Sequence, residues 1–511
     1  MLEVCEVGNK VSKEDYKAEV PELRVKLINA QYDLRDADFP VIIWIAGDDR
    51  LAANALVNRL NEWFDSRFIG TRVFAERTEE ESQRPQLWRL WRSLPPKGAA
   101  SFFVGGLMRA ASQLAEGELT QAEFSAWLSH IARMQEALVD DGALVLKFFL
   151  HTPAKVQKKK LREAQKHPER GWQVDKRDWA ALDTLGPVLP IAERMLRETS
   201  APGAPWTIVE STDERYRDLT VARTILAAIT ARMAEPTKPS TPSVAESVFG
   251  EFDEEANVLS GVDLSKTMSR EQYRRALAKE QARLHDLSIE ARKRGVSTVL
   301  AFEGWDAAGK GGVIRRITAA LEAGDFGVIP VAAPSQEERK FHYLWRFWRD
   351  LPPAGKFVIF DRTWYGRVLV ERLEGFATMA EWQRAFDEIN DFESQLVERG
   401  LYVAKFWLHI SQEEQLARFK AREETPYKKH KITEEDYRNR ERWHDYVKAV
   451  DQMILRTASD GAKWHVIPAN DKYFARVATL KAINKGLART LRQTPAGPPR
   501  SADLASRPAP N

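Results

Sequence analysis

The segment from Gly304 to Gly312 has the clearest chemical pattern in the sequence. It reads GWDAAGKGG, in which Gly304, Gly309 and Lys310 have the GxxxxGK spacing of a phosphate-binding loop, the P-loop. Glycines let backbone N–H groups turn toward phosphate oxygens, while Lys310 and a helix N-terminus add positive charge. The alternative is a glycine-rich turn with a solvated lysine, but an apolar run precedes the segment and a helical pattern follows it. The predicted phosphate-binding residues are Lys310 and the glycines Gly304, Gly309, Gly311 and Gly312.

Gly311 stands where most such loops have a serine or threonine whose hydroxyl holds Mg²⁺. The metal therefore needs other oxygen ligands. Asp306, at the mouth of the same loop, can supply a carboxylate, and Mg²⁺ prefers a few carboxylates and several waters. We predict that Asp306 contacts the metal or the attacking phosphate. The alternative is that Asp306 accepts loop N–H bonds and only shapes the turn.

A second motif, Asp361 to Arg367, follows an apolar run at 357–360. An aspartate that ends a strand beside a P-loop is the Walker-B arrangement, in which the carboxylate holds Mg²⁺ against the phosphates. Arg362 and Arg367 can spread the charge of phosphoryl oxygens. Such an aspartate alone often just caps a helix, so the prediction depends on its pairing with the loop. The predicted catalytic residues are Asp306, Lys310, Asp361 and Arg362, and the predicted metal ligands are Asp306 and Asp361.

The third feature is a run of cations that joins two predicted helices and contains Pro426. A mobile helical hairpin of this kind can close over a polyanion and exclude water, as phosphoryl transfer requires. The alternative is a solvated helix face, because Glu434, Glu435, Asp436 and Glu441 are interleaved, and the sequence favours neither. The cations are Arg418, Lys420, Arg422, Lys428, Lys429, Lys431, Arg438, Arg440 and Arg442, with Trp443 and Tyr446 among them.

These motifs need elements that hold them at one edge of a sheet. Buried strands are predicted at 297–302, 357–360, 402–408 and 464–467, and helices at 310–323, 381–399, 411–424, 434–457 and 471–490. Alternating strands and helices predict an α/β fold, a doubly wound parallel sheet with helices on both faces and a helical lid. Ligands of such sheets bind at the carboxyl ends of the strands, where both motifs fall.

The two halves of the chain repeat each other. LWRLWRSLPPKG at Leu87 and LWRFWRDLPPAG at Leu344 lie 257 residues apart and are identical at nine of twelve positions. The same offset aligns PVIIWIAGDD with STVLAFEGWD, and an offset of 258 aligns KFFLH at Lys147 with KFWLH at Lys405. Chance similarity does not hold one register over separate blocks, so a tandem duplication is predicted.

Composition predicts the domain layout and excludes some function classes. A linker rich in Pro, Ser, Thr and acidic residues at 235–262 separates domains at 1–234 and 263–492, and the tail at 493–511 is predicted to be disordered. With 77 Lys and Arg against 74 Asp and Glu, the net charge is +3, so neither nucleic acid nor membrane is expected as a partner. The single cysteine, Cys5, excludes an intrachain disulfide. Since no signal peptide or long apolar stretch is expected either, the predicted location is cytoplasmic.

With these motifs the C-terminal half resembles the second family of polyphosphate kinases. The resemblance rests on GWDAAGKGG at Gly304, YLWRFWRDLPPAG at Tyr343, DRTWYGRVLVER at Asp361, KFWLHIS at Lys405 and KITEEDYRNRERWHDY at Lys431. The tandem layout is similar to the subgroup described as polyphosphate:AMP phosphotransferases, in which one copy is active. The resemblance implies transfer of a terminal phosphoryl group from inorganic polyphosphate to AMP, giving ADP, with Mg²⁺ as cofactor. It also implies phosphate contacts by Arg362 and Arg367, and by Arg440 and Arg442 in the lid.

The N-terminal half has lost most of these residues. By the same offsets, the positions of Gly309, Lys310, Gly311, Asp361, Arg440 and Arg442 are held by Ala52, Ala53, Asn54, Val104, Leu182 and Thr184, whereas Asp49 matches Asp306. Without the lysine and the Walker-B carboxylate, this half is predicted not to catalyse transfer. Its basic cluster has two interpretations, a guide for a polyphosphate chain or a solvated helix face, and the solvated face is favoured. The cluster consists of Lys155, Lys158, Lys159, Lys160 and Arg162.

Other functions remain open at the level of sequence. A polyphosphate-dependent nucleoside diphosphate kinase differs only in its acceptor. An ATP-dependent nucleoside monophosphate kinase normally has Ser or Thr where Gly311 stands. A scaffold that only binds polyphosphate or nucleic acid would not need Asp306, Lys310 and Asp361 together. The preference among AMP, GMP, ADP and GDP, the preferred chain length, reversibility and the formation of a homo-oligomer are also left open.

Overall fold

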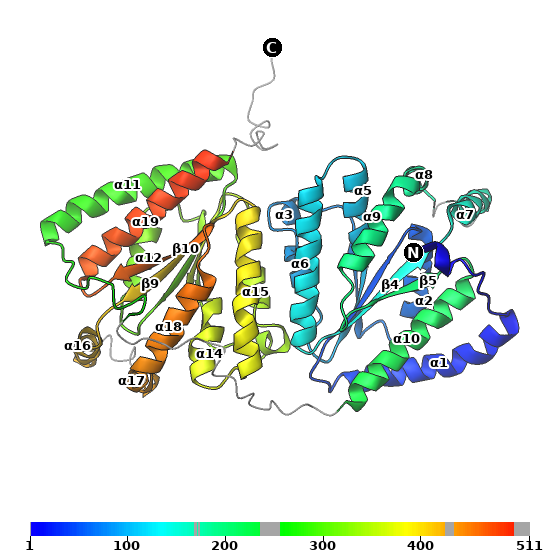
Figure 1. Cartoon of the computed structure of the whole chain (residues 1–511), viewed down its shortest axis with the longest axis horizontal. Helices are drawn as coiled ribbons and strands as arrows, with labels where there is room; N and C mark the ends of the chain where they lie inside the picture. The colour runs from blue at the N-terminus through cyan, green and yellow to red at the C-terminus, as the bar shows by residue number, and fades with distance from the viewer. Residues whose placement is uncertain (1, 168–170, 172–173, 236–255, 425–433, 495–511) are drawn as a thin grey trace, which may run out of the picture. The chain divides into compact units, whose positions relative to one another are not determined.

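The computed structural model describes residues 2–167, 171, 174–235, 256–424 and 434–494, and most of the predicted linker and tail lie outside them. The chain divides into two compact units (Figure 1). One comprises Met1–Thr78, Arg89–Pro239 and Ser335–Trp345, and the other comprises Glu79–Trp88, Ser240–Pro334 and Arg346–Asn511. We call residues 2–235 the N-terminal half and residues 256–494 the C-terminal half. Each half contributes one five-stranded parallel sheet.

The sheet of the C-terminal half has the strand order β7-β8-β6-β9-β10. Its strands are β6 (Thr298–Gly304), β7 (Phe326–Pro330), β8 (Phe357–Asp361), β9 (Tyr402–His409) and β10 (Ala462–Pro468). All of β9 is buried, and β6 is buried as far as Glu303, as expected for central strands that are covered on both faces. The register pairs Phe302 with Asp361, which brings the carboxyl ends of β6 and β8 together.

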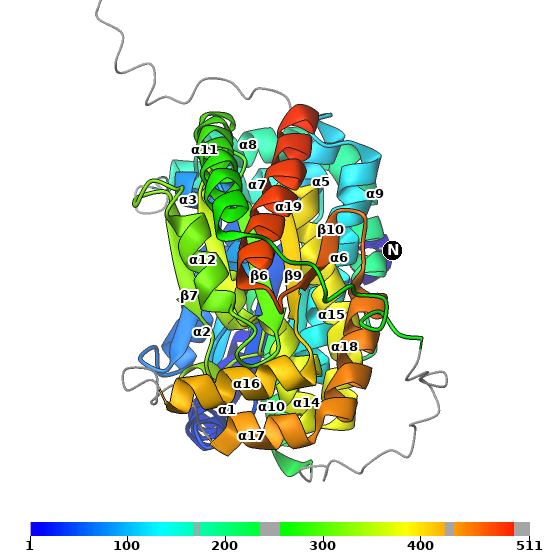
Figure 2. The same ribbon diagram turned by 90° about the vertical axis from the view of Figure 1, so that its left-hand side faces the viewer.

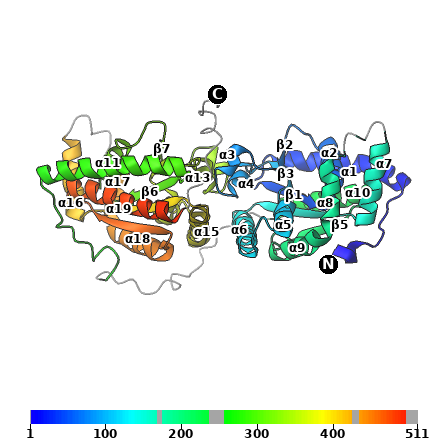
Figure 3. The same ribbon diagram turned by 90° about the horizontal axis from the view of Figure 1, so that it is seen from above.

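Helices cover both faces of this sheet (Figure 1, Figure 3). On one face α11 (Arg270–Arg294), α12 (Lys310–Thr318) and α19 (Lys472–Gln493) pack together, and on the other α15 (Met379–Glu398) packs with α18 (Trp443–Thr457). The remaining elements are η4 (Glu338–Lys340), α13 (Trp345–Arg349), η5 (Trp364–Val368), α14 (Val370–Leu373), α16 (Gln412–Glu423) and α17 (Glu434–Glu441). Figure 2 shows α16 and α17 next to each other at one end of this half. Among the described helices, none combines the length and the apolar character needed to cross a membrane.

The N-terminal half repeats this topology with the order β2-β3-β1-β4-β5. Its strands are β1 (Val41–Gly47), β2 (Ile69–Phe74), β3 (Ala100–Gly105), β4 (Leu144–His151) and β5 (Trp206–Glu210). Its helices are η1 (Leu2–Cys5), α1 (Lys13–Leu34), α2 (Arg50–Trp63), α3 (Glu79–Ser82), α4 (Trp88–Arg92), α5 (Leu107–Ala115), α6 (Gln121–Asp140), α7 (Ala154–Lys166), α8 (Lys176–Asp183), α9 (Leu185–Glu198) and α10 (Glu214–Ala234). Ile45 pairs with Val104 as Phe302 pairs with Asp361, so the predicted α/β fold and its duplication are confirmed.

The sequence-based expectation omits α11 and several short helices, and it differs from the structure in three further elements. The sequence did not predict β7, because this edge strand is partly buried or exposed along its length and lacks a continuous apolar run. The helix predicted at 310–323 ends at Thr318. The helix predicted at 434–457 is two helices, α17 and α18, with Arg442 between them. The N-terminal half has the same break at Thr184, between α8 and α9, so the break belongs to the shared fold and does not require an arginine.

Candidate active site

The P-loop predicted from the sequence lies between β6, which ends at Gly304, and α12, which begins at Lys310. Gly309 precedes the helix with φ 108°, a conformation that favours glycine. Gly304 has φ 146°, which also favours glycine, and in addition a Cβ there would lie 2.7 Å from the carbonyl oxygen of Leu408 on β9. A Cβ at Gly47 would likewise lie 2.5 Å from a carbonyl oxygen of β4. Close strand packing therefore explains this glycine in both halves.

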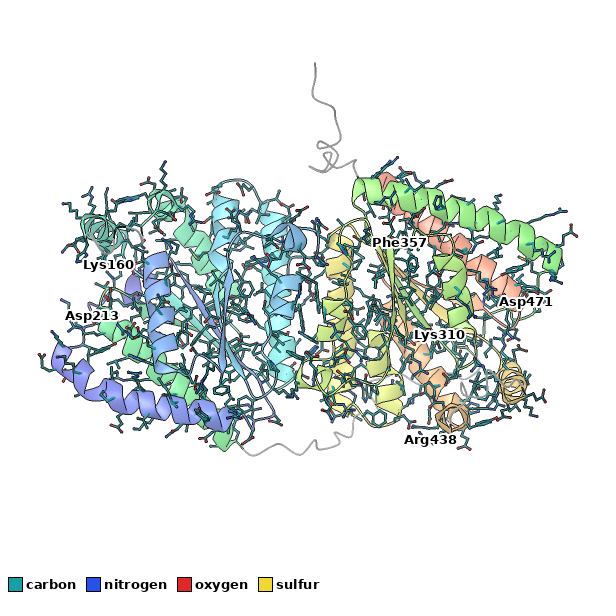
Figure 4. All side chains as sticks on the ribbon, turned by 180° about the vertical axis from the view of Figure 1, so that it is seen from behind. Lys160, Asp213, Lys310, Phe357, Arg438 and Asp471 are labelled. Atoms are coloured by element: carbon teal, nitrogen blue, oxygen red, sulfur yellow. The ribbon has the colours of Figure 1, made fainter. Side chains whose placement is uncertain are left out.

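Lys310 lines a cavity of about 540 Å³ beside the loop. Its Nζ donates a hydrogen bond to the carbonyl oxygen of Gly304 at 2.6 Å, and Figure 4 shows its place at the start of α12. The other cations that line the cavity are Arg315, Arg362, Arg418, Arg422, Lys472 and Arg476, and the carboxylates are Asp306 and Asp361. Because cations are in excess, the cavity suits a polyanion.

Asp306 connects the loop to the second motif and to the lid. Its Oδ1 accepts a hydrogen bond from Nη2 of Arg362 at 3.2 Å, and its Oδ2 accepts one from Nδ2 of Asn439 on α17 at 3.1 Å. Its backbone carbonyl accepts a bond from Gln415 on α16 at 3.3 Å. The side chain therefore does more than shape its own turn, because it faces groups from two other elements.

Arg362 has an unusual backbone conformation. Its φ is 65°, a left-handed conformation that costs a residue other than glycine roughly 1–2 kcal/mol. Its backbone N–H donates to the carbonyl oxygen of Phe302 at 3.0 Å, which fixes the turn against β6. In the N-terminal half the corresponding residue is Gly105, with φ 75°. An arginine in a turn that favours glycine indicates that its side chain has a function there.

The two carboxylates of the cavity fit a Mg²⁺ ion. Asp361 is the last residue of β8, and Asp306 lies in the loop that follows the neighbouring strand β6. Mg²⁺ is usually held by one or two protein carboxylates together with phosphate oxygens and waters. Within the described residues, no group of three or more His, Cys, Asp or Glu side chains could hold a metal ion by itself. A Mg²⁺ ion at this site would therefore bind together with phosphate.

The other predicted phosphate-binding arginines contact protein groups in this structure. Arg367, in η5, pairs with Glu371 at 3.1 Å. Arg440 donates to a carbonyl oxygen of α16, and Arg442 donates to one of α14. None of these three arginines is among the residues that line the two cavities beside the loop. Their contacts with phosphate stay predictions. In this conformation Arg440 and Arg442 hold the lid against α16 and α14, whereas Arg367 contacts α14 from η5.

Arg418 has a structural role that the sequence did not reveal. It is 5% exposed, and its guanidinium donates to the carbonyl oxygens of Ala307 and Ala308 in the P-loop at 3.0 Å. The same side chain also donates to the carbonyl oxygen of Ala469 at 2.7 Å. Arg418 therefore fixes the loop backbone from α16, while Arg438 on α17 is exposed (Figure 4). The predicted lid residues Pro426, Lys428, Lys429 and Lys431 lie outside the described residues.

A second cavity, of about 70 Å³, shares Trp305, Asp306, Lys310 and Arg362 with the first. The rest of its lining is mostly aromatic, aliphatic or amide, namely Leu369, Val370, Trp407, Gln415, Asn439 and Tyr446, with Glu303, Gly304 and Gly366. Trp305 stacks on Trp443 of α18, with ring centroids 3.6 Å apart and planes at 9°. Sequence reasoning did not single out Trp305, although its place inside the glycine-rich loop was a usable signal.

Glu303 is a further site residue that sequence reasoning missed. It is 6% exposed and accepts a hydrogen bond from Oγ1 of Thr363 at 2.8 Å. Burial raises the pKa of this carboxyl group, and the charges of Lys310 and Arg362 oppose the shift. Its neighbours in β6 are apolar, so nothing local marked it as functional. The corresponding residue of the N-terminal half is Ala46.

The N-terminal half has a helical turn in place of the P-loop. β1 ends at Gly47 and α2 begins at Arg50, so the helix starts two residues after Asp48, close behind the strand. Asp49 caps this helix, because its Oδ1 accepts a hydrogen bond from the N–H of Ala52 at 3.0 Å. Ala52 and the next residue, which replace the loop glycine and lysine, are buried within α2. This half therefore offers no glycine-rich loop to a phosphate at this point.

A cavity of about 470 Å³ remains beside that helix, but its charges differ. Its lining includes the carboxylates Asp48, Asp49, Glu163, Asp178 and Glu214, against the cations Arg50, Lys160 and Arg217. Arg50 pairs with Asp178 at 2.6 Å, and Lys160 donates to the carbonyl oxygen of Ser211 at 3.0 Å. Figure 4 shows Lys160 and Asp213, which flank this region. The other cations of the basic cluster are exposed on α7, so the cavity lacks the cation excess of its counterpart.

Known proteins with similar sequences and structures share the whole two-part layout. The family described as Polyphosphate kinase 2 (PPK2) matches residues 10–237 and again residues 267–495. A protein from Pseudomonas aeruginosa named polyphosphate:AMP phosphotransferase is 44% identical over 95% of this chain and 98% of its own length. Its namesake from Pseudomonas syringae pv. tomato is 42% identical over the same shares. A crystal structure from Pseudomonas aeruginosa PA01, described as a polyphosphate kinase 2, matches with a TM-score of 0.85 and 42% identity, over 96% of this chain and 100% of that one.

Proposed function

Because this chain belongs to the polyphosphate kinase 2 family, we propose that its C-terminal half transfers the terminal phosphoryl group of inorganic polyphosphate to AMP and so forms ADP. The observation that carries the proposal is the larger cavity, where Asp306, Lys310, Asp361 and Arg362 lie together. The names of two relatives that match nearly the full chain support this choice of donor and acceptor.

The larger cavity is the proposed donor site. Its cations come from three helices, with Arg315 on α12, Arg422 on α16, and Lys472 and Arg476 on α19, in addition to those of the two motifs. Its uncharged lining is mainly glycine, alanine and valine, and its aromatic residue, Trp305, already stacks on another ring. A chain of phosphates without a base matches this lining better than a nucleoside triphosphate does.

In the proposed reaction, a phosphate oxygen of AMP attacks the terminal phosphorus of polyphosphate. The bond from that phosphorus to the bridging oxygen breaks, and the shortened chain leaves with the bond electrons. Phosphate monoesters are largely dianionic near neutral pH, so the attacking oxygen needs no general base. Lys310 and Arg362 stabilise charge on the transferred group, and Asp306 orients the guanidinium of Arg362. Asp306 and Asp361 would hold Mg²⁺, which would supply positive charge close to the phosphate groups.

For the acceptor we propose the smaller cavity, which adjoins the donor site through their shared residues. An aromatic and aliphatic lining with a few amide groups suits a base and a ribose. At about 70 Å³ the cavity is too small for a whole nucleoside, so acceptor binding requires the lid residues Asn439 and Tyr446 to move outward. Acceptor binding and lid movement are therefore expected to be coupled.

The test is formation of ADP by the full chain from polyphosphate, AMP and Mg²⁺, followed by chromatography. ADP should form with polyphosphate and much more slowly when ATP replaces it. GMP, ADP and GDP serve as acceptors in parallel reactions. Faster formation of nucleoside triphosphates from the diphosphates would assign a nucleoside diphosphate kinase instead, and ATP as the better donor would assign an ordinary nucleoside monophosphate kinase.

A further inference from the structure

Glu393 on α15 lies at the centre of a buried hydrogen-bond network behind the second motif. It is 2% exposed. Its Oε1 accepts hydrogen bonds from Nε1 of Trp364 at 3.0 Å and from the hydroxyl of Tyr365 at 2.6 Å. Its Oε2 accepts one from Nζ of Lys405 on β9 at 2.7 Å, and this lysine also contacts the Tyr365 hydroxyl at 3.1 Å. One carboxylate thus joins α15, β9 and the segment that directly follows Arg362.

The segment after Arg362 is also fixed from its other side. Thr363 donates to Glu303 on β6 at 2.8 Å, and its Oγ1 accepts a bond from the N–H of Tyr365 at 3.1 Å. Two buried carboxylates therefore hold three consecutive side chains. A strained backbone conformation such as that of Arg362 persists only where the surrounding contacts hold it in place. The network supplies such contacts, because it leaves the residues after Arg362 little freedom to relax the turn.

The N-terminal half shows that the fold does not need this network. The counterparts of Trp364, Tyr365 and Glu393 are Leu107, Met108 and Gln135. The buried lysine is kept as Lys147, which donates to Oε1 of Gln135 at 2.7 Å, and burial lowers its pKa to about 7. The left-handed turn is also kept, with Gly105 in place of the arginine. The carboxylate and its two aromatic donors are thus absent from the half whose turn carries no arginine.

We propose that Glu393 is a positioning residue for phosphoryl transfer, because it holds Trp364 and Tyr365 so that Arg362 can present its guanidinium to Asp306 and to the transferred phosphoryl group. This inference rests on the function proposed above. Glu393 does not line either cavity beside the P-loop, so it acts through Arg362 and does not touch the substrates. Its loss should therefore lower kcat and leave substrate binding nearly intact.

The first experiment is Glu393→Gln in the full chain, which introduces the residue found at Gln135. We expect kcat to fall on the order of 10-fold, because a small misplacement of a charge-stabilising group is costly, with the KM values for polyphosphate and AMP nearly unchanged. The matched control is Glu280→Gln on α11. Glu280 is 6% exposed and accepts a bond from Asn484 at 2.9 Å, remote from the second motif, and this variant should keep full kcat.

The second experiment separates positioning from general stability. In an Arg362→Ala background, Glu393→Gln should have no further effect on the residual kcat, because the group that it positions is gone. Equal fold losses in both backgrounds would overturn the proposal, and so would full kcat in the single variant. If Glu393→Gln does not fold, the same kinetic comparison is made with Tyr365→Phe. This variant removes one hydrogen bond to Glu393 and keeps the ion pair between Glu393 and Lys405. Absence of ADP formation by the unaltered chain would instead count against the proposed function.

Discussion

The two halves of this protein have the same sheet order and register, but different side chains at the point where phosphate would bind. In the C-terminal half, residues 305–309 separate β6 from α12 and form the P-loop. In the N-terminal half, α2 begins almost directly after β1, and a helical turn occupies the corresponding place. The shared strands, the shared glycine at the strand end and the shared buried lysine show what the fold requires. The loop, Lys310 and Asp361 are not part of that requirement.

The largest expected effect comes from removing the charges that only one half has. Lys310→Ala and Asp361→Asn should each lower the rate of ADP formation by about 10² to 10³, equivalent to about 3 kcal/mol of transition-state stabilisation. Thermal unfolding should change little, because the N-terminal half folds with alanine and valine at these positions. Near-normal turnover in either variant, measured by steady-state kinetics, would mean that the assigned site is wrong.

The next largest effect on the rate is expected at the turn of Arg362. The two halves allow matched substitutions here, in which each half receives the residue of the other. Arg362→Gly should lower the rate on the order of 10- to 100-fold, while relief of the left-handed strain keeps the unfolding free energy equal or slightly higher. Gly105→Arg should leave the rate unchanged and lower stability by about 1–2 kcal/mol, because its φ is 75° although space for a Cβ exists. Calorimetry and kinetics on both variants test this. Loss of stability in Arg362→Gly would contradict the strain argument.

A smaller effect is expected in the lid. The residues of the N-terminal half that correspond in sequence to Arg440 and Arg442 are Leu182 and Thr184. Replacing both arginines by glutamine should raise the KM for polyphosphate by about 10-fold, as two charge-assisted contacts are lost from the closed lid. Thermal stability should fall only slightly, since partly exposed ion pairs contribute little. Unchanged kinetics at low polyphosphate concentration would show that these side chains only hold the lid to α14 and α16.

Matching histidines at the ends of β9 and β4 should give the two halves opposite pH dependence of stability. Nδ1 of His409 accepts a hydrogen bond from Trp305 at 3.0 Å, and burial lowers its pKa to about 4. Burial also opposes the charged form of His151, but the carboxylates of Asp48 and Glu6 outweigh it and raise the pKa.

The sign of each effect follows from proton uptake on unfolding. Below about pH 6.5 His409 binds a proton in the unfolded chain, but in the folded chain it stays neutral down to about pH 4. The free energy of unfolding therefore falls as the pH is lowered through this window, by roughly 3 kcal/mol at most. The contribution of His151 is complete below about pH 6.5 and is lost as pH rises through its raised pKa. Calorimetry of His409→Asn and His151→Asn against pH checks both. If the two substitutions changed the pH dependence of the unfolding free energy in the same direction, the difference in partners between the two histidines would be contradicted.

The sequence predicted the parts of the site that are continuous along the chain. The loop from Gly304 to Lys310 could be recognised because its glycines and lysine are close together, and Asp361 could be placed because it ends an apolar run. Lys472 and Arg476 could not be assigned, since only the packing of α19 against α12 brings them to the loop. Glu393 could not be assigned either. It lies 28 residues from Tyr365 along the chain, and nothing local distinguishes it from other glutamates on a helix.

The sequence also could not show how the N-terminal half departs from the C-terminal half. The alignment placed Asp49 opposite Asp306, which implied that one loop residue was retained. In the structure, Asp49 caps α2 and Asp306 faces Arg362 and Asn439. The same residue type at the same offset therefore has different partners, because the helix starts earlier in one half. Local spacing alone does not indicate where a helix begins.

The most direct test of the account is the same substitution at these two aspartates. Asp306→Asn should lower ADP formation from polyphosphate and AMP by about 10² or more, since it removes a charge that orients Arg362 and would bind Mg²⁺. Asp49→Asn should keep the full rate, because asparagine also caps a helix and α2 offers no phosphate site. Steady-state kinetics of both full-length variants at saturating Mg²⁺ decides. A large loss of rate in Asp49→Asn, or full activity in Asp306→Asn, would contradict the assignment of the chemistry to the C-terminal half.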